Sequence, residues 1–333
     1  MSFIDRRQFV KQGLAAGSFV LAAPYVSHGA EPVIMKLGHP DTALHPGHAL
    51  GVQFGKLLEE RTNGDIKVRV FPGGQLGSNT NIVTGLTTGI VDFSIHTAGY
   101  ASSVYTKLQV LDLPFLFRDT ATAEKVLDGP LGQELLGGMS ATGIYGLSWG
   151  THGWRLTETT NRAVREPADL KGLKIRIQPS PVFNATFKAI GAVPVVMDIT
   201  ELYLALSQGT VQGMELPFMA VASSKLYEVT KHVGVTNHVY NASLLMASKP
   251  KMDSLDPKHQ EIIRATAAEI RPVWRKLVVE KTAEAKQLCE SKGMAVQETN
   301  YQAFRSSVQP VYEEFRPTIG AELVDKFMKE TSV

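Results

Sequence analysis

The sequence predicts an α/β protein with two α/β units and a helical C-terminal third. Two patterns predict this class. Apolar residues alternate with polar ones along several short segments, as in strands, and recur at helical spacing in the segments between them. The order strand–helix–strand is found in both halves of the chain, and it is typical of α/β domains with a largely parallel sheet.

The first expected unit contains three strands and two helices. Its first helix ends in the turn Thr62-Asn63-Gly64, and Gly89 closes its second helix. Ligands of such folds lie at loops beyond the carboxyl ends of the strands. The expected strands are Val33–Gly38, Ile66–Phe71 and Val91–Ile95, and the expected helices are His48–Arg61 and Asn79–Thr88.

A crossing between the two units is expected next. Helix-forming stretches at Ala121–Leu127 and Leu131–Met139 precede a strand-like stretch, Trp149–Thr157, which contains Gly150 and Gly153. We interpret that stretch as the segment that passes from one unit to the other.

The second expected unit repeats the alternation of strands and helices, and the helical region follows it. We expect Pro272 to kink the long helix, and Pro310 and Pro317 to break the last one. The expected strands are Leu173–Ile177, Val193–Val196, Val211–Met214 and Val233–Thr236, and the expected helices are Val182–Ile190, Glu201–Gln208, Pro257–Ser291 and Tyr301–Lys329.

Residues 1–30 are interpreted as an export signal. The paired Arg6 and Arg7, followed by Phe9 and Lys11, precede an apolar, small-residue stretch, and this resembles a twin-arginine signal. An ordinary secretory signal that carries two arginines remains the alternative. Either signal places the mature protein outside the inner membrane, in the periplasm.

Composition excludes some functions. Lys and Arg number 34 and Asp and Glu 32, and residues 1–30 hold three of the basic and one of the acidic residues. The remainder is therefore balanced at 31 of each, so we expect no nucleic-acid partner, and any attraction for anions must come from local sites. Cys289, the only cysteine, excludes an internal disulfide and a cysteine zinc site, and we interpret it as a core residue.

Two other function classes are possible. His39, His45 and His48 lie close together in sequence, with Asp41 beside them, which suggests a periplasmic metal-binding protein. A secreted enzyme is the second class, although the sequence contains no GxSxG, HExxH, GxGxxG or phosphate-loop motif.

Six motifs in a fixed order resemble the substrate-binding subunits of tripartite ATP-independent periplasmic (TRAP) transporters. The resemblance covers essentially the whole chain after residue 30. It implies the two-lobed periplasmic binding-protein fold, with hinged α/β domains and a long helix that spans both lobes. The motifs are Arg61–Gly64, Phe71–Gly77, Asp112–Phe117, Asp169–Arg176, Glu201–Leu206 and Thr236–His238.

The same resemblance implies the function and the partners. It places residues 31–152 and 242–281 in lobe I, and residues 153–241 and 282–333 in lobe II. Such subunits capture a small carboxylate-bearing organic acid and deliver it to a small and a large membrane subunit, driven by an ion gradient. They have no catalytic residues and no cofactor, so we expect the protein not to be an enzyme.

Arg176 is the first candidate for binding the ligand. It lies at the end of an expected strand, and its planar guanidinium matches a carboxylate with two parallel hydrogen bonds. The resemblance implies a second ligand arginine at Arg155, which could instead be an exposed strand residue. It also points to His238, which could donate to the ligand or be a structural histidine.

Further candidates line the rest of the expected cleft. Asn79, Thr97 and Tyr100 correspond to positions that select the remainder of the ligand, and all three are neutral. In the segment Glu215-Leu216-Pro217, Leu216 replaces a common Asn of the family, and burying a ligand hydroxyl against it costs ~1–3 kcal/mol. We therefore expect a small acid with an apolar patch rather than a large sugar acid.

Overall fold

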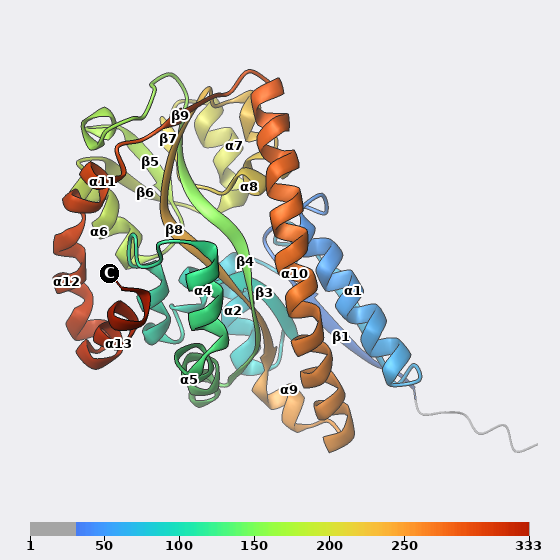
Figure 1. Cartoon of the computed structure of the whole chain (residues 1–333). Helices are drawn as coiled ribbons and strands as arrows, with labels where there is room; N and C mark the ends of the chain where they lie inside the picture. The colour runs from blue at the N-terminus through green and yellow to red at the C-terminus, as the bar shows by residue number, and fades with distance from the viewer. Residues whose placement is uncertain (1–30, 333) are drawn as a thin grey trace, which may run out of the picture. The chain divides into compact units, whose positions relative to one another are not determined.

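A single mixed sheet forms the centre of the protein. A computed structural model describes residues 31–332, and within that range nine strands pair in the order β2-β1-β3-β8-β4-β7-β5-β6, with β9 beside β8 (Figure 1). The strands are β1 (Val33–Gly38), β2 (Ile66–Phe71), β3 (Phe93–Thr97), β4 (Ile144–Thr159), β5 (Lys174–Ile177), β6 (Val193–Val196), β7 (Gly213–Met214), β8 (His232–Ser248) and β9 (Ala295–Glu298).

The sheet is parallel at both ends and antiparallel in the middle. β1 pairs in parallel with β2 and β3, and β5 pairs in parallel with β6 and β7. The long strands β4 and β8 run antiparallel to each other along the centre. The prediction of a largely parallel sheet is thus correct for the outer strands and wrong for the centre, where two long strands join the halves.

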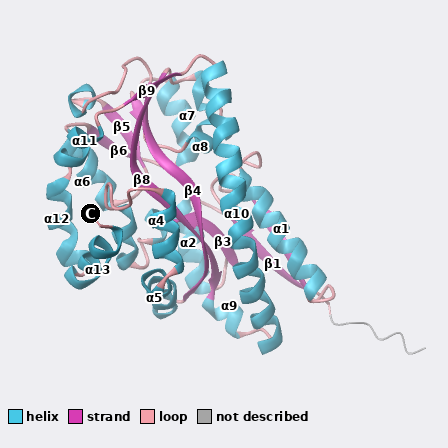
Figure 2. Cartoon of the chain, viewed as in Figure 1, coloured by secondary structure: helices cyan, strands magenta, loops and turns pink. Residues whose placement is uncertain are grey.

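Helices cover both faces of this sheet (Figure 2). Side chains of α1 and α7–α10 pack into one apolar cluster, and those of α2, α4–α6 and α11–α13 pack into the other. The helices are α1 (Pro46–Arg61), α2 (Asn79–Thr88), α3 (Ala98–Ala101), α4 (Thr120–Asp128), α5 (Pro130–Gly138), α6 (Pro181–Ile190), α7 (Ile199–Ser207), α8 (Phe218–Ser223), α9 (Lys249–Asp253), α10 (Pro257–Ser291), α11 (Tyr301–Ser307), α12 (Gln309–Ile319) and α13 (Ala321–Thr331).

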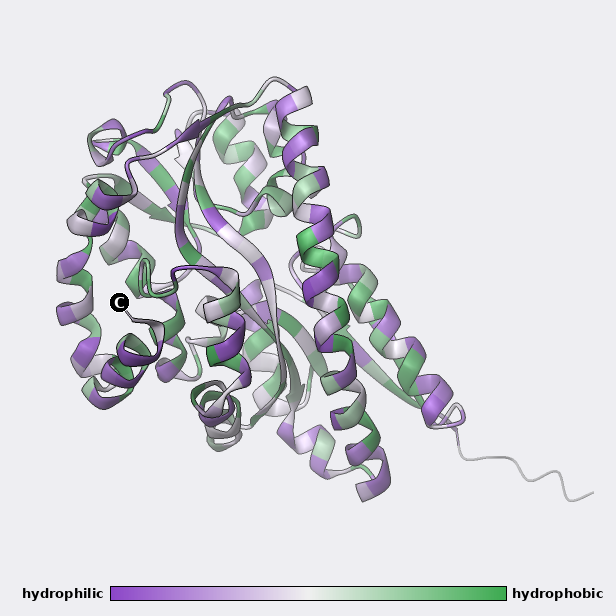
Figure 3. Cartoon of the chain, in the orientation of Figure 1, coloured by the Kyte–Doolittle hydropathy of each residue, from purple (hydrophilic) through white to green (hydrophobic). Residues whose placement is uncertain are grey.

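The two cores follow from the alternation of side chains along the strands. On β8, Leu244 and Met246 belong to one apolar cluster, while Leu245 and Ala247 belong to the other. Apolar side chains are therefore needed at successive positions of the central strands, because both faces are buried. Figure 3 shows the complementary pattern on α1 and α10, where polar and apolar residues alternate around each helix.

The long helix α10 packs against β4 and also against α1 and α8. It continues without a break through Pro272. Its Trp274 lies directly on β4 at Gly150, where an added Cβ would come within 2.2 Å of the indole ring. Gly150 is therefore required for the close approach of this helix to the central strand.

Several predicted boundaries hold and others are wrong. β1, β2, β6 and α2 coincide with their predicted ranges. The predicted short strand Val233–Thr236 is the start of the long β8. The sequence pattern does not indicate the full length of this strand, because the polar residues Asn237 and His238 interrupt its apolar run. The final helical region does break near Pro310, but its second break is at Gly320, and Pro317 lies inside α12.

The export-signal prediction for residues 1–30 lies outside the described residues. Within residues 31–332, no helix combines the length and the apolar character needed to cross a bilayer.

Candidate ligand-binding site

A small cavity lies where the carboxyl ends of β1, β3 and β5 meet the centre of β4. Its volume is about 30 Å³. This is the edge at which α/β folds bind ligands. The lining residues come from both halves of the chain: Pro40, Asp41, Thr97, Tyr100, His152, Arg155, Arg176, Gln178, Ile199, Leu216 and Ala220.

Arg176 lies in this cavity without a carboxylate partner. Its side chain is buried, Nε donates to the carbonyl of Met197 at 2.9 Å, and Nη2 donates to the Tyr100 hydroxyl at 3.3 Å. Within residues 31–332, no acidic side chain forms an ion pair with it, and its Nη1 has no hydrogen-bond partner. A buried guanidinium in this condition is costly, and an anion in the cavity would relieve that cost.

Arg155 also lines the cavity, but its charge is compensated. Its Nε and Nη2 bind the two carboxylate oxygens of Glu215, and Nη2 also donates to the Glu215 carbonyl at 2.6 Å. Burial alone would raise the pKa of Glu215, but Arg155 and His238 together outweigh burial and hold that pKa below its usual range. The pair therefore adds no net charge to the cavity, and Arg176 supplies its uncompensated positive charge.

Glu215 and His238 lie behind Arg155 rather than in the cavity wall. His238 Nε2 is 3.7 Å from Glu215, and its Nδ1 is 2.8 Å from the Thr236 hydroxyl. Burial lowers the pKa of His238, which favours the neutral ring. These two predicted residues therefore hold Arg155 in place, and no contact with the cavity is seen for either.

Asn79, the first residue of α2, connects β3 with the N-cap of α7 next to the cavity. Its Nδ2 donates to Asp198 at 2.9 Å, and its Oδ1 is 3.2 Å from His96 Nε2. Burial lowers the pKa of His96 to about 3, so the ring is neutral and its Nε2–H donates to Asn79. Asn79 is thus a neighbour of the site, and it does not line the cavity.

The remaining predicted residues form the cavity walls. The Thr97 hydroxyl donates to Gln178 at 3.2 Å, and Tyr100 contacts Arg176. Leu216 makes an apolar wall together with Ile199 and Ala220. Five of the eight predicted residues therefore line one cavity: Thr97, Tyr100, Arg155, Arg176 and Leu216.

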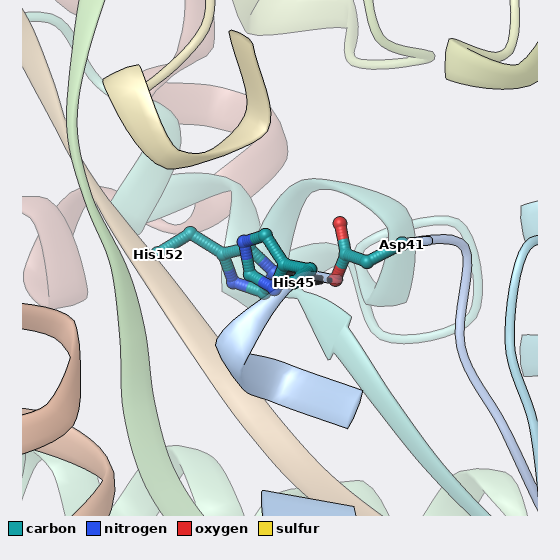
Figure 4. Close-up of side chains that lie close together, drawn as sticks. All are labelled: Asp41, His45 and His152. Atoms are coloured by element: carbon teal, nitrogen blue, oxygen red, sulfur yellow. Dashed lines mark hydrogen bonds and ion pairs between the residues drawn. The ribbon is translucent and has the colours of Figure 1, made fainter. Parts of the chain in front are cut away.

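A buried group of Asp41, His45 and His152 lies at the edge of the cavity (Figure 4). Asp41 Oδ2 is 2.9 Å from His152 Nε2 and 3.4 Å from His45 Nδ1, and the two rings stack with centroids 4.8 Å apart. His152 Nδ1 contacts the Ser243 hydroxyl. His45 Nδ1 accepts the backbone N–H of Gly47 and so caps α1.

The predicted cluster of His39, His45 and His48 is not formed. His39 Nε2 and His48 Nδ1 are 3.1 Å apart, but His45 turns to Asp41 and His152 instead. The reason is that His45 is the N-cap of α1 while His48 lies one turn inside it. Within residues 31–332, the group with metal-ligand spacing is Asp41, His45 and His152.

Sequence reasoning did not assign three polar residues of the cavity lining to the ligand site: Asp41, His152 and Gln178. Asp41 lies in the loop that follows the carboxyl end of β1, so the rule that ligands lie beyond strand ends could have identified it. His152 had no such signal, because its partner Asp41 is 111 residues away in sequence.

Comparison with known proteins identifies the family of this chain. Residues 37–318 match the DctP family, described as bacterial extracellular solute-binding protein, family 7. The 2,3-diketo-L-gulonate-binding periplasmic protein YiaO of Escherichia coli K12 is 36% identical over 74% of this chain and 75% of its own. The C4-dicarboxylate-binding periplasmic protein DctP of Rhodobacter capsulatus is 32% identical over 94% of each chain.

A solved structure extends the likeness to the fold. The TRAP periplasmic solute-binding protein of Polaromonas sp. JS666, bound to D-erythronate, superposes with a TM-score of 0.85 and 31% identity over 89% of this chain and 98% of that one. The match confirms the two-lobed solute-binding fold that the sequence motifs imply. The chain therefore belongs to family 7 of the bacterial extracellular solute-binding proteins, the DctP family of TRAP transporter components.

Proposed function

We propose that this protein captures a small organic acid in the cavity between its lobes and that Arg176 binds the acid's carboxylate. The observation that carries the proposal is the buried Arg176 guanidinium, which has no carboxylate partner in residues 31–332 and leaves Nη1 without a hydrogen-bond partner. A carboxylate is the ligand group that satisfies both the charge and the donor.

The residues around Arg176 support a binding role. Nε is fixed by the Met197 carbonyl and Nη2 by Tyr100, so the guanidinium plane is held before a ligand arrives. Arg155 is positioned nearby by Glu215 and can add a further donor. Each charge-assisted hydrogen bond contributes ~1.5–3 kcal/mol, and two or three of them with apolar packing reach the ~8 kcal/mol of micromolar affinity.

The relatives support the ligand class. The acids that they bind or are named for, D-erythronate, 2,3-diketo-L-gulonate and C4-dicarboxylates, all carry a carboxylate. In our proposal the residues named above bind and orient the acid, and none of them acts as a catalyst.

Delivery to a membrane transporter completes the proposed role. We infer that lobes made of residues 31–152 with 242–281 and of residues 153–241 with 282–333 close around the acid by rotating about β4 and β8. The closed form then docks on a small and a large membrane subunit. Export by the twin-arginine route would place the protein in the periplasm. Replacing Arg6 and Arg7 by Lys should abolish that export, and unchanged export would favour the general secretory route.

Thermal unfolding of the purified protein with a panel of organic acids, neutral sugars and divalent metals tests the proposal. A ligand that binds only the folded state stabilises it by ~2.7 kcal/mol at a hundredfold excess over its dissociation constant. We expect a raised midpoint with carboxylates and no change with neutral sugars. The shift should be lost in Arg176→Ala and kept in Arg275→Ala, because Arg275 pairs with Asp128 outside the cavity. A shift with metals alone would refute the proposal.

A further inference from the structure

Asp41 places a negative charge in the same cavity as Arg176. Arg155 is neutralised by Glu215, so the charges of the lining residues reduce to Arg176 and Asp41. Asp41 comes from the loop after β1, whereas Arg176 comes from β5. A ligand that fills the cavity thus meets a cation from one half of the chain and an anion from the other.

The Asp41 carboxylate keeps its charge and a free acceptor. The hydrogen bond from His152 Nε2 at 2.9 Å favours the ionised form of this carboxylate. Oδ2 faces the two histidines, and Oδ1 has no hydrogen-bond partner within the described residues. Figure 4 shows one Asp41 oxygen toward the histidines and the other turned away from them.

The histidines orient Asp41 without removing its charge. An ionised carboxylate only accepts, so His152 must donate to it from Nε2, and its Nδ1 then accepts from the Ser243 hydroxyl. His45 cannot donate from Nδ1, because that nitrogen already accepts the Gly47 N–H, and burial lowers the pKa of His45 to about 4. Asp41 therefore accepts from one side-chain donor, His152.

These contacts decide which groups of a ligand the cavity accepts beside Asp41. A hydroxyl donates to the free oxygen and satisfies it. A second carboxylate cannot donate, and it repels Asp41 in a site with little water to screen the charges. An aliphatic group leaves this oxygen without a donor. Leu216, Ile199 and Ala220 remain available for the carbon-bound hydrogens of the ligand.

We propose that Asp41, oriented by His152, makes this cavity select acids with one carboxylate and several hydroxyl groups over dicarboxylates and unsubstituted acids. The inference rests on the proposed role of Arg176 and names the ligand class of that site. It replaces the expectation of a less polar acid, which the neutral Asn79, Thr97 and Tyr100 suggest when Asp41 is left out of the cavity lining.

Isothermal titration calorimetry with two series of acids of equal chain length tests the selection. The four-carbon series is erythronate, tartrate, succinate and butyrate, and the six-carbon series is galactonate, galactarate, adipate and hexanoate. Each series varies the second carboxylate and the hydroxyls independently. In at least one series the hydroxylated monocarboxylate should bind about tenfold or more tightly than the other three acids.

Two variants assign that preference to Asp41. Asp41→Asn keeps the shape and one acceptor but removes the charge, so the ratio between the hydroxylated monocarboxylate and the dicarboxylates should shrink about tenfold. Asp92→Asn is the matched control, since Asp92 is buried, accepts the backbone N–H of Lys36 and does not line the cavity. It should leave the ratio unchanged. The comparison within the unaltered protein needs no variant, so a misfolded Asp41→Asn leaves the test intact.

The outcomes separate this inference from the proposed function. If acids bind through Arg176 but dicarboxylates bind as tightly as hydroxylated monocarboxylates, or more tightly, the proposed selection is wrong and the proposed function stands. An unchanged ratio in Asp41→Asn would also overturn it. Binding of any acid that requires added Zn²⁺ would assign Asp41, His45 and His152 to a metal and overturn it as well. No binding by any acid would overturn both.

Discussion

Replacing Glu215 by Gln should destabilise the fold and increase the stabilisation that an anion bound in the cavity provides. Glu215 is fully buried and forms two side-chain bonds with the equally buried Arg155. The amide keeps the shape and one acceptor but leaves the Arg155 charge uncompensated. Removing one partner of a buried ion pair costs about 3–5 kcal/mol.

This cost has a measurable size. With an unfolding entropy of about 2.1 cal/mol/K per residue, ~1 kcal/mol corresponds to about 1.4 °C in a chain of 333 residues, so the midpoint should fall by about 4–7 °C. Differential scanning calorimetry measures it. Carboxylate ligands should then raise the midpoint of Glu215→Gln by more than that of the unaltered protein, because they compensate two guanidinium charges in place of one.

Two comparisons make the reasoning refutable. The double variant Arg155→Met with Glu215→Leu removes both charges and should be more stable than Glu215→Gln alone. Asp128→Asn breaks a partly exposed bidentate pair with Arg275 and should cost less than about 1 kcal/mol. A loss in Glu215→Gln no larger than that in Asp128→Asn would refute the view that a buried charge balance holds Arg155 in the cavity wall.

Three further variants test separate parts of the structure. Gly150→Ala should destabilise the protein by about 1–3 kcal/mol or prevent folding, because its Cβ would meet the ring of Trp274 at 2.2 Å. Urea unfolding measures this change. An unaffected stability would contradict the close packing of α10 on β4. Burial lowers the pKa of His96 to about 3, so the neutral ring contributes stability that is fully present above pH 6.5. That stability is lost by about 1.4 kcal/mol per pH unit as the pH falls from 6.5 toward 3. His96→Gln should therefore flatten the fall in stability below pH 6.5. Equal pH profiles of the two proteins would refute it. Cys289 should not react with a thiol reagent until the protein unfolds, because it is buried and burial raises its thiol pKa to about 12; fast labelling of the native protein would contradict its place in the core.

Local patterns were enough to predict the outer parts of the sheet. β1, β2 and α2 obey short-range rules of alternation and capping, and their predicted bounds match the structure. The central strands do not obey them, because β8 is buried on both faces and is interrupted by polar residues such as His238, whose partner Glu215 comes from the loop after β7. Such a strand is recognised only once its neighbours are known.

The site divides in the same way. Arg176 is predicted because it closes a family motif, and Arg155 because its position matches a second ligand arginine of the family; both line the cavity. Asp41 and His152 are not predicted, since their role arises from a contact between residues far apart in sequence. The neutral residues Asn79, Thr97 and Tyr100 predict a weakly polar ligand, and that expectation does not take into account Asp41, which lines the same cavity.

The affinity of an Arg176→Lys variant for an organic acid tests the central claim most directly. Lysine keeps the charge but lacks the planar fork and the bond from Nε to the Met197 carbonyl. Calorimetric titration should show binding at least about tenfold weaker than in the unaltered protein, whereas Arg275→Lys, changed outside the cavity, should bind as before. Equal affinities in Arg176→Lys and the unaltered protein would contradict the claim that this guanidinium binds the carboxylate.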